Sequence, residues 1–159
     1  MTVKKLCVGS GRAGETGPEW INVDAADFGN NVVWDLNRHP WPFADETFFE
    51  VKAIDVVEHL CECAAAISEI IRVARPGGLI LIQVPHAAHA RTWIDPGHKR
   101  GFMRESLDYW IRGNRRAKQY GELYHQGRFF ITDLTVREQG ANLVFRCRRA
   151  PAQKSTVSL

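Results

Sequence analysis

Five short apolar runs in the first half of the chain predict five strands. Each run is bounded by Gly, Pro, Asn or Asp, residue types that favour turns between strands. The last run, "GLILIQVP", is almost continuously apolar, as expected for a strand that is covered on both faces of a parallel sheet. The predicted strands are Lys5–Val8, Trp20–Asp24, Asn31–Asp35, Phe49–Asp55 and Leu79–Val84.

Between the fourth and fifth runs the apolar spacing changes to that of a helix. Ile67, Ile70, Ile71 and Ala74 recur at i, i+3, i+4 and i+7, which places them on one stripe. We expect this helix to stop at Pro76-Gly77-Gly78, because proline cannot continue the ladder and glycine suits a sharp reversal. A strand, a helix and a strand in this order predict a right-handed βαβ unit over a parallel sheet.

The last third of the chain changes character. A helix is predicted to start near Arg104, with Leu107, Trp110 and Ile111 facing inward. Two strands are then predicted around the turn Gln139–Asn142, in an antiparallel hairpin that closes the sheet. The pattern as a whole predicts an α/β, Rossmann-like three-layer sandwich, with residues 1–150 as a single domain and 151–159 as a flexible tail.

Composition narrows the class further. The chain has 159 residues, 45% of them hydrophobic and 25% charged, which is ordinary for one soluble domain. No apolar run approaches the length of a membrane span, so no membrane partner is expected and a cytoplasmic location is the default. The four cysteines lack zinc-ribbon spacing and are expected to be reduced. The net charge of +3 does not favour a nucleic-acid partner, because no stacking motif accompanies the basic residues.

Motifs in the correct order over roughly residues 5–85 resemble those of class I S-adenosylmethionine-dependent methyltransferases. "LCVGSG" resembles the first strand and glycine loop of that family, and "WINVDAAD" its second strand with a terminal acid. "VVWDLNRHPWPFADETFFEV" resembles the third strand and the approach to the fourth. The segments "IDVVEHL" and "EIIRVARPGGLILIQVP" resemble the family's "VLEH" turn and its "RVLKPGG" turn. The resemblance is to short members of the methyltransferase type 11 kind with a truncated first helix.

The resemblance implies S-adenosylmethionine as cofactor, bound beyond the carboxyl ends of the strands. The methionine part of the cofactor would lie on the glycine loop, and the ribose would bond the acid that ends the second strand. The acid that ends the third strand would take the adenine amino group, and the leucine after it would pack on the adenine ring. Residues after the fourth strand would border the methionyl group. The implied cofactor-binding residues are Gly9, Ser10, Gly11, Asp24, Ala25, Asp35, Leu36, Asp55, Val56 and His59.

The sequence also departs from that pattern. Cys7 stands where the first strand often carries an acid, and Ala13 replaces a third glycine. Only residues 12–19 separate the glycine loop from the second strand, whereas a parallel crossover usually needs a dozen or more residues. The first helix is therefore predicted to be absent or a single turn. The uncovered sheet would expose apolar surface, which suggests a homodimer or another chain segment as its cover.

The segment after the fifth strand is the expected wall of the acceptor site. His86, His89 and His98 are candidate catalytic bases, because imidazole titrates near neutral pH. Their pattern, H-x2-H-x5-D-x2-H, contains metal-ligand types, but it matches no known metal motif and we assign no metal. An alternative for His98 is a structured turn in which it bonds backbone. Lys99 and Arg100 would suit an anionic acceptor.

The expected function is transfer of a methyl group from S-adenosylmethionine to a small-molecule or macromolecular acceptor that the sequence does not identify. A second hypothesis is a catalytically degenerate scaffold or binding protein that keeps the methyltransferase fold. A nicotinamide-dependent enzyme is a third reading. It is disfavoured, because the glycine loop has no following helix N-terminus to receive a pyrophosphate.

Overall fold

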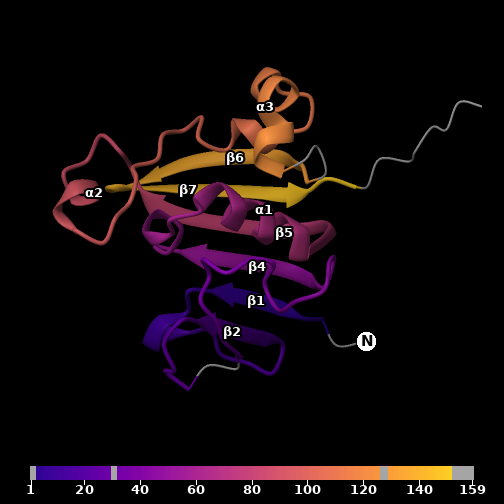
Figure 1. Ribbon diagram of the computed structural model, residues 1–159, viewed down its shortest axis with the longest axis vertical. Coiled ribbons are helices and arrows are strands. Elements are labelled where there is room, and N and C mark those ends of the chain that lie inside the picture. Colours follow the sequence, from indigo (N-terminus) through magenta and orange to yellow (C-terminus); the bar gives the residue numbers. More distant parts are fainter. Residues whose placement is uncertain (1–2, 30–31, 126–128, 152–159) are drawn as a thin grey trace, which may run out of the picture.

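The computed structural model describes residues 3–29, 32–125 and 129–151. Seven strands form one sheet in the order β3-β2-β1-β4-β5-β7-β6 (Figure 1). The first five strands are parallel to one another, and β7 runs antiparallel to both of its neighbours. The strands are β1 (Lys5–Val8), β2 (Trp20–Asp24), β3 (Val32–Val33), β4 (Phe48–Ile54), β5 (Ala74–Pro85), β6 (Ile131–Gln139) and β7 (Asn142–Arg149).

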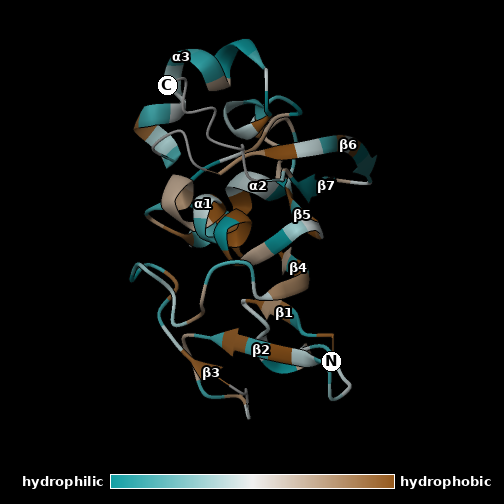
Figure 2. Ribbon diagram, turned by 90° about the vertical axis from the view of Figure 1, so that its right-hand side faces the viewer, coloured by the Kyte–Doolittle hydropathy of each residue, from teal (hydrophilic) through white to brown (hydrophobic). Residues whose placement is uncertain are grey.

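The two longer helices of the described residues, α1 (Cys63–Val73) and α3 (Arg115–His125), lie on the same side of the sheet (Figures 1 and 2). Ser68 ties them together. Its Oγ donates to the backbone oxygen of Tyr124 at 2.9 Å and accepts from Trp110 Nε1 at 3.1 Å. The shorter elements are η1 (Gly11–Ala13), η2 (Val57–His59), α2 (Arg91–Ile94) and η3 (Asp108–Trp110). No helix in the described part of the chain is long and apolar enough to cross a membrane.

The strand predictions are confirmed, with small differences at the ends. β1 and β2 have the predicted bounds, and β4 is displaced by one residue. β3 contains only Val32 and Val33, because the chain turns at Asp35, whose carbonyl accepts from the N–H of Arg38 at 2.9 Å. Asn31, the predicted first residue of that strand, lies outside the described residues.

The predicted helix before β5 is α1, but it ends three residues earlier than expected. Ala74 already belongs to β5, so the Pro76-Gly77-Gly78 turn lies inside that strand. Gly77 has φ +75°, a left-handed conformation that suits glycine. The pairing of β5 with β4 shifts its register between Phe48 and Glu50, as expected when extra residues bulge from one strand.

The helix predicted near Arg104 is wrong. The structure has a single 3₁₀ turn at Asp108–Trp110 and starts α3 only at Arg115. Gly113 lies between them at φ +85°, which a continuous right-handed helix cannot contain. The inward faces were nevertheless correct, because Leu107 and Trp110 are 1% and 3% exposed.

The C-terminal hairpin is confirmed, since β6 and β7 pair antiparallel around the predicted turn. Gly140 occupies that turn at φ +60°. The predicted flexible tail begins at Pro151, and its residues 152–159 lie outside the described part of the chain.

The α/β, Rossmann-like class is confirmed. The predicted third layer is not found among the described residues, because the two longer helices, α1 and α3, lie on the same side of the sheet (Figure 2). On β4, β5 and β7 the other side presents alternating side chains in register, among them Glu50 opposite Leu79 and Lys52 opposite Leu81. Arg148 and Arg146 lie opposite the same two leucines on β7. This open face therefore mixes charged side chains with leucines, and the continuous apolar patch expected from the missing helix is not what these strands expose.

A pinned loop stands where the first helix of the fold would be, as the short crossover predicted. After η1, the side chain of Asn22 pairs with the backbone of Glu15: its Oδ1 accepts from the N–H and its Nδ2 donates to the carbonyl, each at 2.9 Å. Lys52 of β4 then bonds the Glu15 carboxylate at 2.8 Å. Asn22 and Lys52 are both in register with Cys7 of β1, so these contacts hold the segment around Glu15 over the face of the sheet without a helix.

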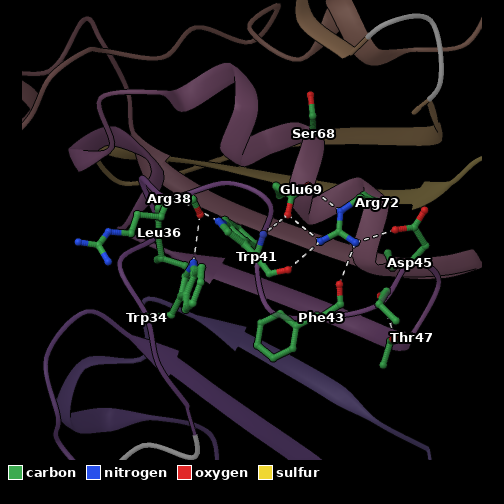
Figure 3. Close-up of polar contacts among 12 residues, drawn as sticks. Trp34, Leu36, Arg38, Trp41, Phe43, Asp45, Thr47, Ser68, Glu69 and Arg72 are labelled. Carbon is green, nitrogen blue, oxygen red and sulfur yellow. Dashed lines mark hydrogen bonds and ion pairs between the residues drawn. The ribbon is translucent and has the colours of Figure 1, made fainter.

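A second pinned segment, which we call the arginine clamp, joins the loop before β4 to α1 (Figure 3). Arg72 bonds Glu69 through Nε and Nη2 at 2.5 and 2.7 Å. Its Nη1 also bonds Asp45 Oδ1 at 2.6 Å and the carbonyl of Phe43 at 2.8 Å, and Glu69 accepts the N–H of Trp41 at 2.6 Å. The clamp fixes the path of the chain from β3 to β4, where the described residues form no helix.

Candidate functional site

The glycine turn after β1 lies where the strand order reverses. β1 is flanked by β2 on one side and β4 on the other, so Gly9 and Val56 leave neighbouring strands at the same edge. Gly9 has φ +63°, and a Cβ on it would lie 2.2 Å from Val56 Cγ2. Open α/β sheets bind ligands at this kind of position, beyond the carboxyl ends of strands at a topological switch point.

Asp24, the acid predicted to bind a ribose, ends β2 beside this turn. Its Oδ2 accepts the N–H of Gly11 at 2.9 Å, and its Oδ1 accepts the N–H of Ala26 at 3.1 Å. A carboxylate oxygen has a second acceptor position, so both atoms can also accept a ligand hydroxyl. A Cβ on Gly11 would meet no atom within 4 Å, so there is open space above the loop. The neighbouring Ala25 is exposed.

Asp35 and Leu36 follow β3 on the far side of the edge. Asp35 is exposed, and the backbone N–H of Asn37, donated to Oδ1 at 3.0 Å, lowers the pKa of that carboxyl. Leu36 is only 4% exposed, and its carbonyl accepts from Trp41 Nε1 at 3.1 Å (Figure 3). Asp35 is therefore free to face a ligand, whereas Leu36 has little surface to offer one.

Asp55 begins the turn after β4 in a left-handed conformation, φ +50°. Gln83 of β5 donates its side-chain N–H to both Asp55 oxygens at 3.3 Å. A non-glycine residue held in this region is an uncommon conformation that clusters at functional sites. The chain continues into η2, which brings Glu58 and His59 to the same edge of the sheet.

A pocket of about 320 Å³ opens beyond the ends of β4 and β5. It lies next to the Gly9–Val56 contact in the strand order, on the side away from Asp24. The helix α2 and the turn that follows it contribute four of its lining residues, Arg91, Ile94, Asp95 and His98. Its lining residues are Asp55, Glu58, His59, Pro85, Arg91, Ile94, Asp95, His98 and Asn142.

Of the three predicted catalytic histidines, the structure brings one into this pocket. The Nδ1 of His98 donates to the carbonyl of Thr92 at 2.8 Å, which leaves Nε2 as the basic nitrogen of the neutral ring. That nitrogen lies 4.0 Å from Glu58 Oε1 and 3.8 Å from Asp95 Oδ2. The predicted turn is also confirmed, because Asp95 accepts the N–H groups of Gly97 and His98.

The other two histidines lie together outside the pocket lining. His86 and His89 have ring centroids 6.0 Å apart. The Nδ1 of His86 accepts the N–H of Ala88 at 3.0 Å, so its basic nitrogen is already engaged. Of the three, His98 is therefore the best placed to accept a proton from a molecule in the pocket.

Glu58 lines the pocket but was not among the site residues predicted from the sequence. It is 0% exposed, and neither carboxylate oxygen has a hydrogen-bond partner in the described part of the chain. Burial raises its pKa to about 7. Its own backbone N–H, which lies nearby but makes no hydrogen bond to the carboxylate, and His98 oppose the rise, whereas Asp55 and Asp95 add to it. The one feature of the sequence that could have pointed to Glu58 is its place in "VVEHL", the segment that resembles the family's "VLEH" turn.

The titration of Glu58 should make the free energy of unfolding depend on pH, when measured on protein that a chelator has freed of metal ions. Because the folded pKa of about 7 exceeds the reference 4.5, the folded chain binds the proton more tightly than the unfolded chain. Stability should therefore fall as pH rises from about 4.5 to about 7, by on the order of 3 kcal/mol, and then level off. Urea unfolding of the wild type and Glu58→Gln across this range measures the difference. Parallel curves for the two proteins would contradict the assignment.

The strand order, the open carboxyl edge and the antiparallel final hairpin define the class I methyltransferase fold. Residues 13–82, somewhat under half of the chain, match a family model described as a methyltransferase domain. The resemblance to class I S-adenosylmethionine-dependent methyltransferases is thereby confirmed, for the fold and for the matched stretch. No curated protein matches the chain significantly in sequence.

Solved structures share the fold at low sequence identity. A S-adenosylmethionine-dependent methyltransferase from Archaeoglobus fulgidus is 16% identical with a TM-score of 0.67, over 92% of this chain and 86% of that one. The 1,6-didemethyltoxoflavin-N1-methyltransferase of Burkholderia thailandensis, solved with S-adenosylhomocysteine, is 16% identical with a TM-score of 0.57, over 92% and 71%. The cyclase SpnF is 17% identical with a TM-score of 0.56, over 95% and 75%.

Proposed function

We propose that the chain binds S-adenosylmethionine at the carboxyl edge of β1, β2 and β4 and transfers its methyl group to an acceptor. The observation that carries this is the Gly9 turn, closed on Val56 at the switch point, with Asp24 ending the next strand. A related fold in Burkholderia thailandensis holds S-adenosylhomocysteine, the product of such a transfer. The cofactor would supply an activated methyl group, and the protein would chiefly supply proximity and orientation.

The residues present fit such a cofactor. The open space at Gly11 admits the methionine part, beside Ser10 and the Gly9 turn. The second acceptor positions of Asp24 suit the two ribose hydroxyls. The exposed carboxylate of Asp35 would accept the adenine amino group, with the ring lying beside Ala25 and meeting only the small exposed part of Leu36. Asp55, Val56 and His59 would border the methionyl group at the end of β4.

The predicted ribose contact can be tested by calorimetry with S-adenosylmethionine and S-adenosylhomocysteine. We expect Asp24→Ala to weaken binding of both by roughly 10- to 100-fold, since a hydrogen bond to a charged group contributes about 1.5–3 kcal/mol. Asp27→Ala is the matched control. Like Asp24, Asp27 accepts the N–H of the residue two positions further on, Gly29, at 2.9 Å. It is not one of the proposed ribose contacts.

Two outcomes would contradict the proposed cofactor site. One is no heat with either ligand at millimolar concentration, although the protein is folded by circular dichroism. The other is an equal loss of affinity in Asp24→Ala and Asp27→Ala. That result would mean that Asp24 only holds the loop in place and does not contact the ligand.

The acceptor would occupy the pocket beyond β4 and β5, covered by residues 86–125. In the metal-free protein His98 is the proposed base, because its Nε2 carries the lone pair of the neutral ring. The carboxylates of Asp55, Glu58 and Asp95 outnumber the one arginine of the lining, Arg91. A neutral or cationic acceptor therefore fits better than the anionic acceptor that the sequence suggested. Neither Lys99 nor Arg100 is among the lining residues, and the Nη2 of Arg100 donates to the carbonyl of Cys61 at 2.8 Å.

A second candidate is a methyltransferase fold that does not transfer methyl groups. SpnF, named as a cyclase, has this fold and is 17% identical to the chain. A screen with methyl-labelled S-adenosylmethionine and small-molecule or protein extracts separates the two. Binding without label transfer to any acceptor would favour the scaffold. In either case we retain residues 1–150 as one domain.

A further inference from the structure

The carboxylate of Glu58 poses an energetic problem in the described structure. An ionised carboxylate without hydrogen bonds is among the most costly groups to bury, and native structures normally provide it a partner. Glu58 is 0% exposed and has none among the described residues. Its backbone is nevertheless well fixed, because its carbonyl accepts the N–H of Lys99 at 2.7 Å. The side chain is thus held in a place where either a proton or a bound cation would have to neutralise it.

Two imidazoles face the same point. The rings of His59 and His98 meet edge to face, with centroids 4.6 Å apart. One ligand-type atom from each histidine and one from Glu58 all lie within 4.8 Å of one another. The three residues come from two segments, η2 and the turn after α2, which the fold brings together across the pocket.

The hydrogen bonding of His98 is that of a metal ligand. Its Nδ1 donates to a backbone carbonyl, that of Thr92, which fixes the ring and directs the Nε2 lone pair toward Glu58. Metal-binding histidines usually donate their other N–H to a carbonyl or carboxylate in this way. Asp95 adds a carboxylate oxygen, Oδ2, 3.8 Å from the same nitrogen, while its Oδ1 accepts the N–H of Gly97.

We propose that Glu58, His59 and His98 form a binding site for a divalent transition-metal ion, with Asp95 as the fourth ligand. Two imidazoles and a carboxylate suit zinc, iron, nickel or copper better than magnesium or calcium. Three protein ligands with a variable fourth are typical of sites that also admit a water or substrate.

Local charge and space support the same site. Asp55 lies close enough to Glu58 to raise its pKa, so the region carries carboxylates in excess of nearby cations. A Cβ on Gly97 would lie 3.1 Å from His59 Nδ1 and 3.0 Å from Asp95 Oδ1, so glycine lets the turn approach the imidazole. Ligands around zinc, at roughly 2.1 Å from the ion, lie about 3.4 Å apart, and small side-chain rotations would close the present spacing.

The test is a titration of the full chain, freed of metal with a chelator, with Co²⁺ and then Zn²⁺. We expect one equivalent of Co²⁺ to give the visible absorption of a four-coordinate site, and Zn²⁺ to displace it. Glu58→Gln and His98→Asn should each weaken Co²⁺ binding at least tenfold. The double variant His86→Asn/His89→Asn removes a second pair of neighbouring histidines, which lies outside the pocket lining, and should leave the titration unchanged.

Several results would overturn the proposal. They are an unchanged titration in Glu58→Gln and His98→Asn, a loss confined to the His86/His89 double variant, and no binding to folded wild-type protein. A thiolate charge-transfer band would show instead that Cys61 or Cys63 is the ligand. Circular dichroism establishes whether each variant is folded. If Glu58→Gln does not fold, His59→Asn replaces it as the second ligand variant. No S-adenosylmethionine is present, so failure here is distinguishable from failure of the proposed cofactor site.

Discussion

Replacing Arg72 by methionine should lower the free energy of unfolding by about 3–5 kcal/mol, because it leaves the Glu69 carboxylate buried without its partner. Glu69 is 8% exposed, and Arg72 is its charged neighbour at 2.5 and 2.7 Å. The change also removes the donors to the carbonyls of Trp41 and Phe43. Urea unfolding at neutral pH measures the loss.

The matched control is Arg75→Met, which lies three residues further on. Arg75 is exposed, and its guanidinium stacks over the Phe49 ring at 4.4 Å, so its loss should cost less than about 1 kcal/mol. A double variant, Glu69→Met/Arg72→Met, should recover part of the loss, because it removes the unpaired charge. Equal stability of Arg72→Met and Arg75→Met would mean that the arginine clamp does not hold the loop.

The clamp variant should also affect the proposed cofactor site. The clamped segment begins at Trp41, whose indole N–H holds the carbonyl of Leu36 next to Asp35. Loosening it would leave the proposed adenine contact less well fixed, so cofactor affinity should fall in Arg72→Met even under conditions where the protein remains folded.

Gly9→Ala should mainly lower stability, whereas Gly11→Ala should mainly lower cofactor affinity, although the two positions lie two residues apart. Both glycines have left-handed φ, +63° and +53°, so alanine costs about 1–2 kcal/mol at either position. Only at Gly9 does the new Cβ overlap a neighbour, Val56 Cγ2 at 2.2 Å, which adds a further 1–3 kcal/mol of overpacking. Gly9→Ala should therefore lose about 3 kcal/mol of stability, and Gly11→Ala roughly 1 kcal/mol.

Cofactor affinity separates the two roles. The Cβ of Gly11→Ala points into open space, where the methionine part of the cofactor is proposed to lie. This variant should remain folded at room temperature and still bind S-adenosylhomocysteine at least tenfold more weakly than the wild type. Calorimetry beside thermal unfolding measures both quantities. A Gly11→Ala variant with wild-type affinity would place the ligand elsewhere, and a stable Gly9→Ala would show that the turn tolerates another path.

The strands were predictable because their signals are local. Lys5–Val8 and Trp20–Asp24 are short apolar runs between turn residues, and the structure keeps both bounds. The helix predicted to start near Arg104 is wrong because the local apolar spacing is ambiguous. Its apolar spacing suits a helix, yet Gly113 takes a left-handed turn that spacing alone does not reveal.

The pocket was less predictable, because it depends on which distant segments meet. The sequence pattern grouped His86, His89 and His98, which are near one another in the chain. The fold instead pairs His98 with Glu58 and His59, some forty residues earlier, and leaves the other two histidines to one side. Glu58 in particular follows an apolar run and carries no local signal of being buried without a partner.

The glycine loop rests on side chains rather than on a helix, and this affects how ligand binding and local order are coupled. Residues 11–19 are held mainly at three places: by Asp24 at Gly11, by the Asn22 amide and Lys52 at Glu15, and by the N–H of Lys5 at the carbonyl of Glu19. Segments with so few buried contacts open locally at a free energy well below that of global unfolding. A cofactor that needs the closed loop then binds a population in which part of the molecules are open. The apparent affinity for the cofactor is then lower than the intrinsic affinity of the closed loop. A stronger Glu15–Lys52 contact would raise the closed fraction and with it the apparent affinity.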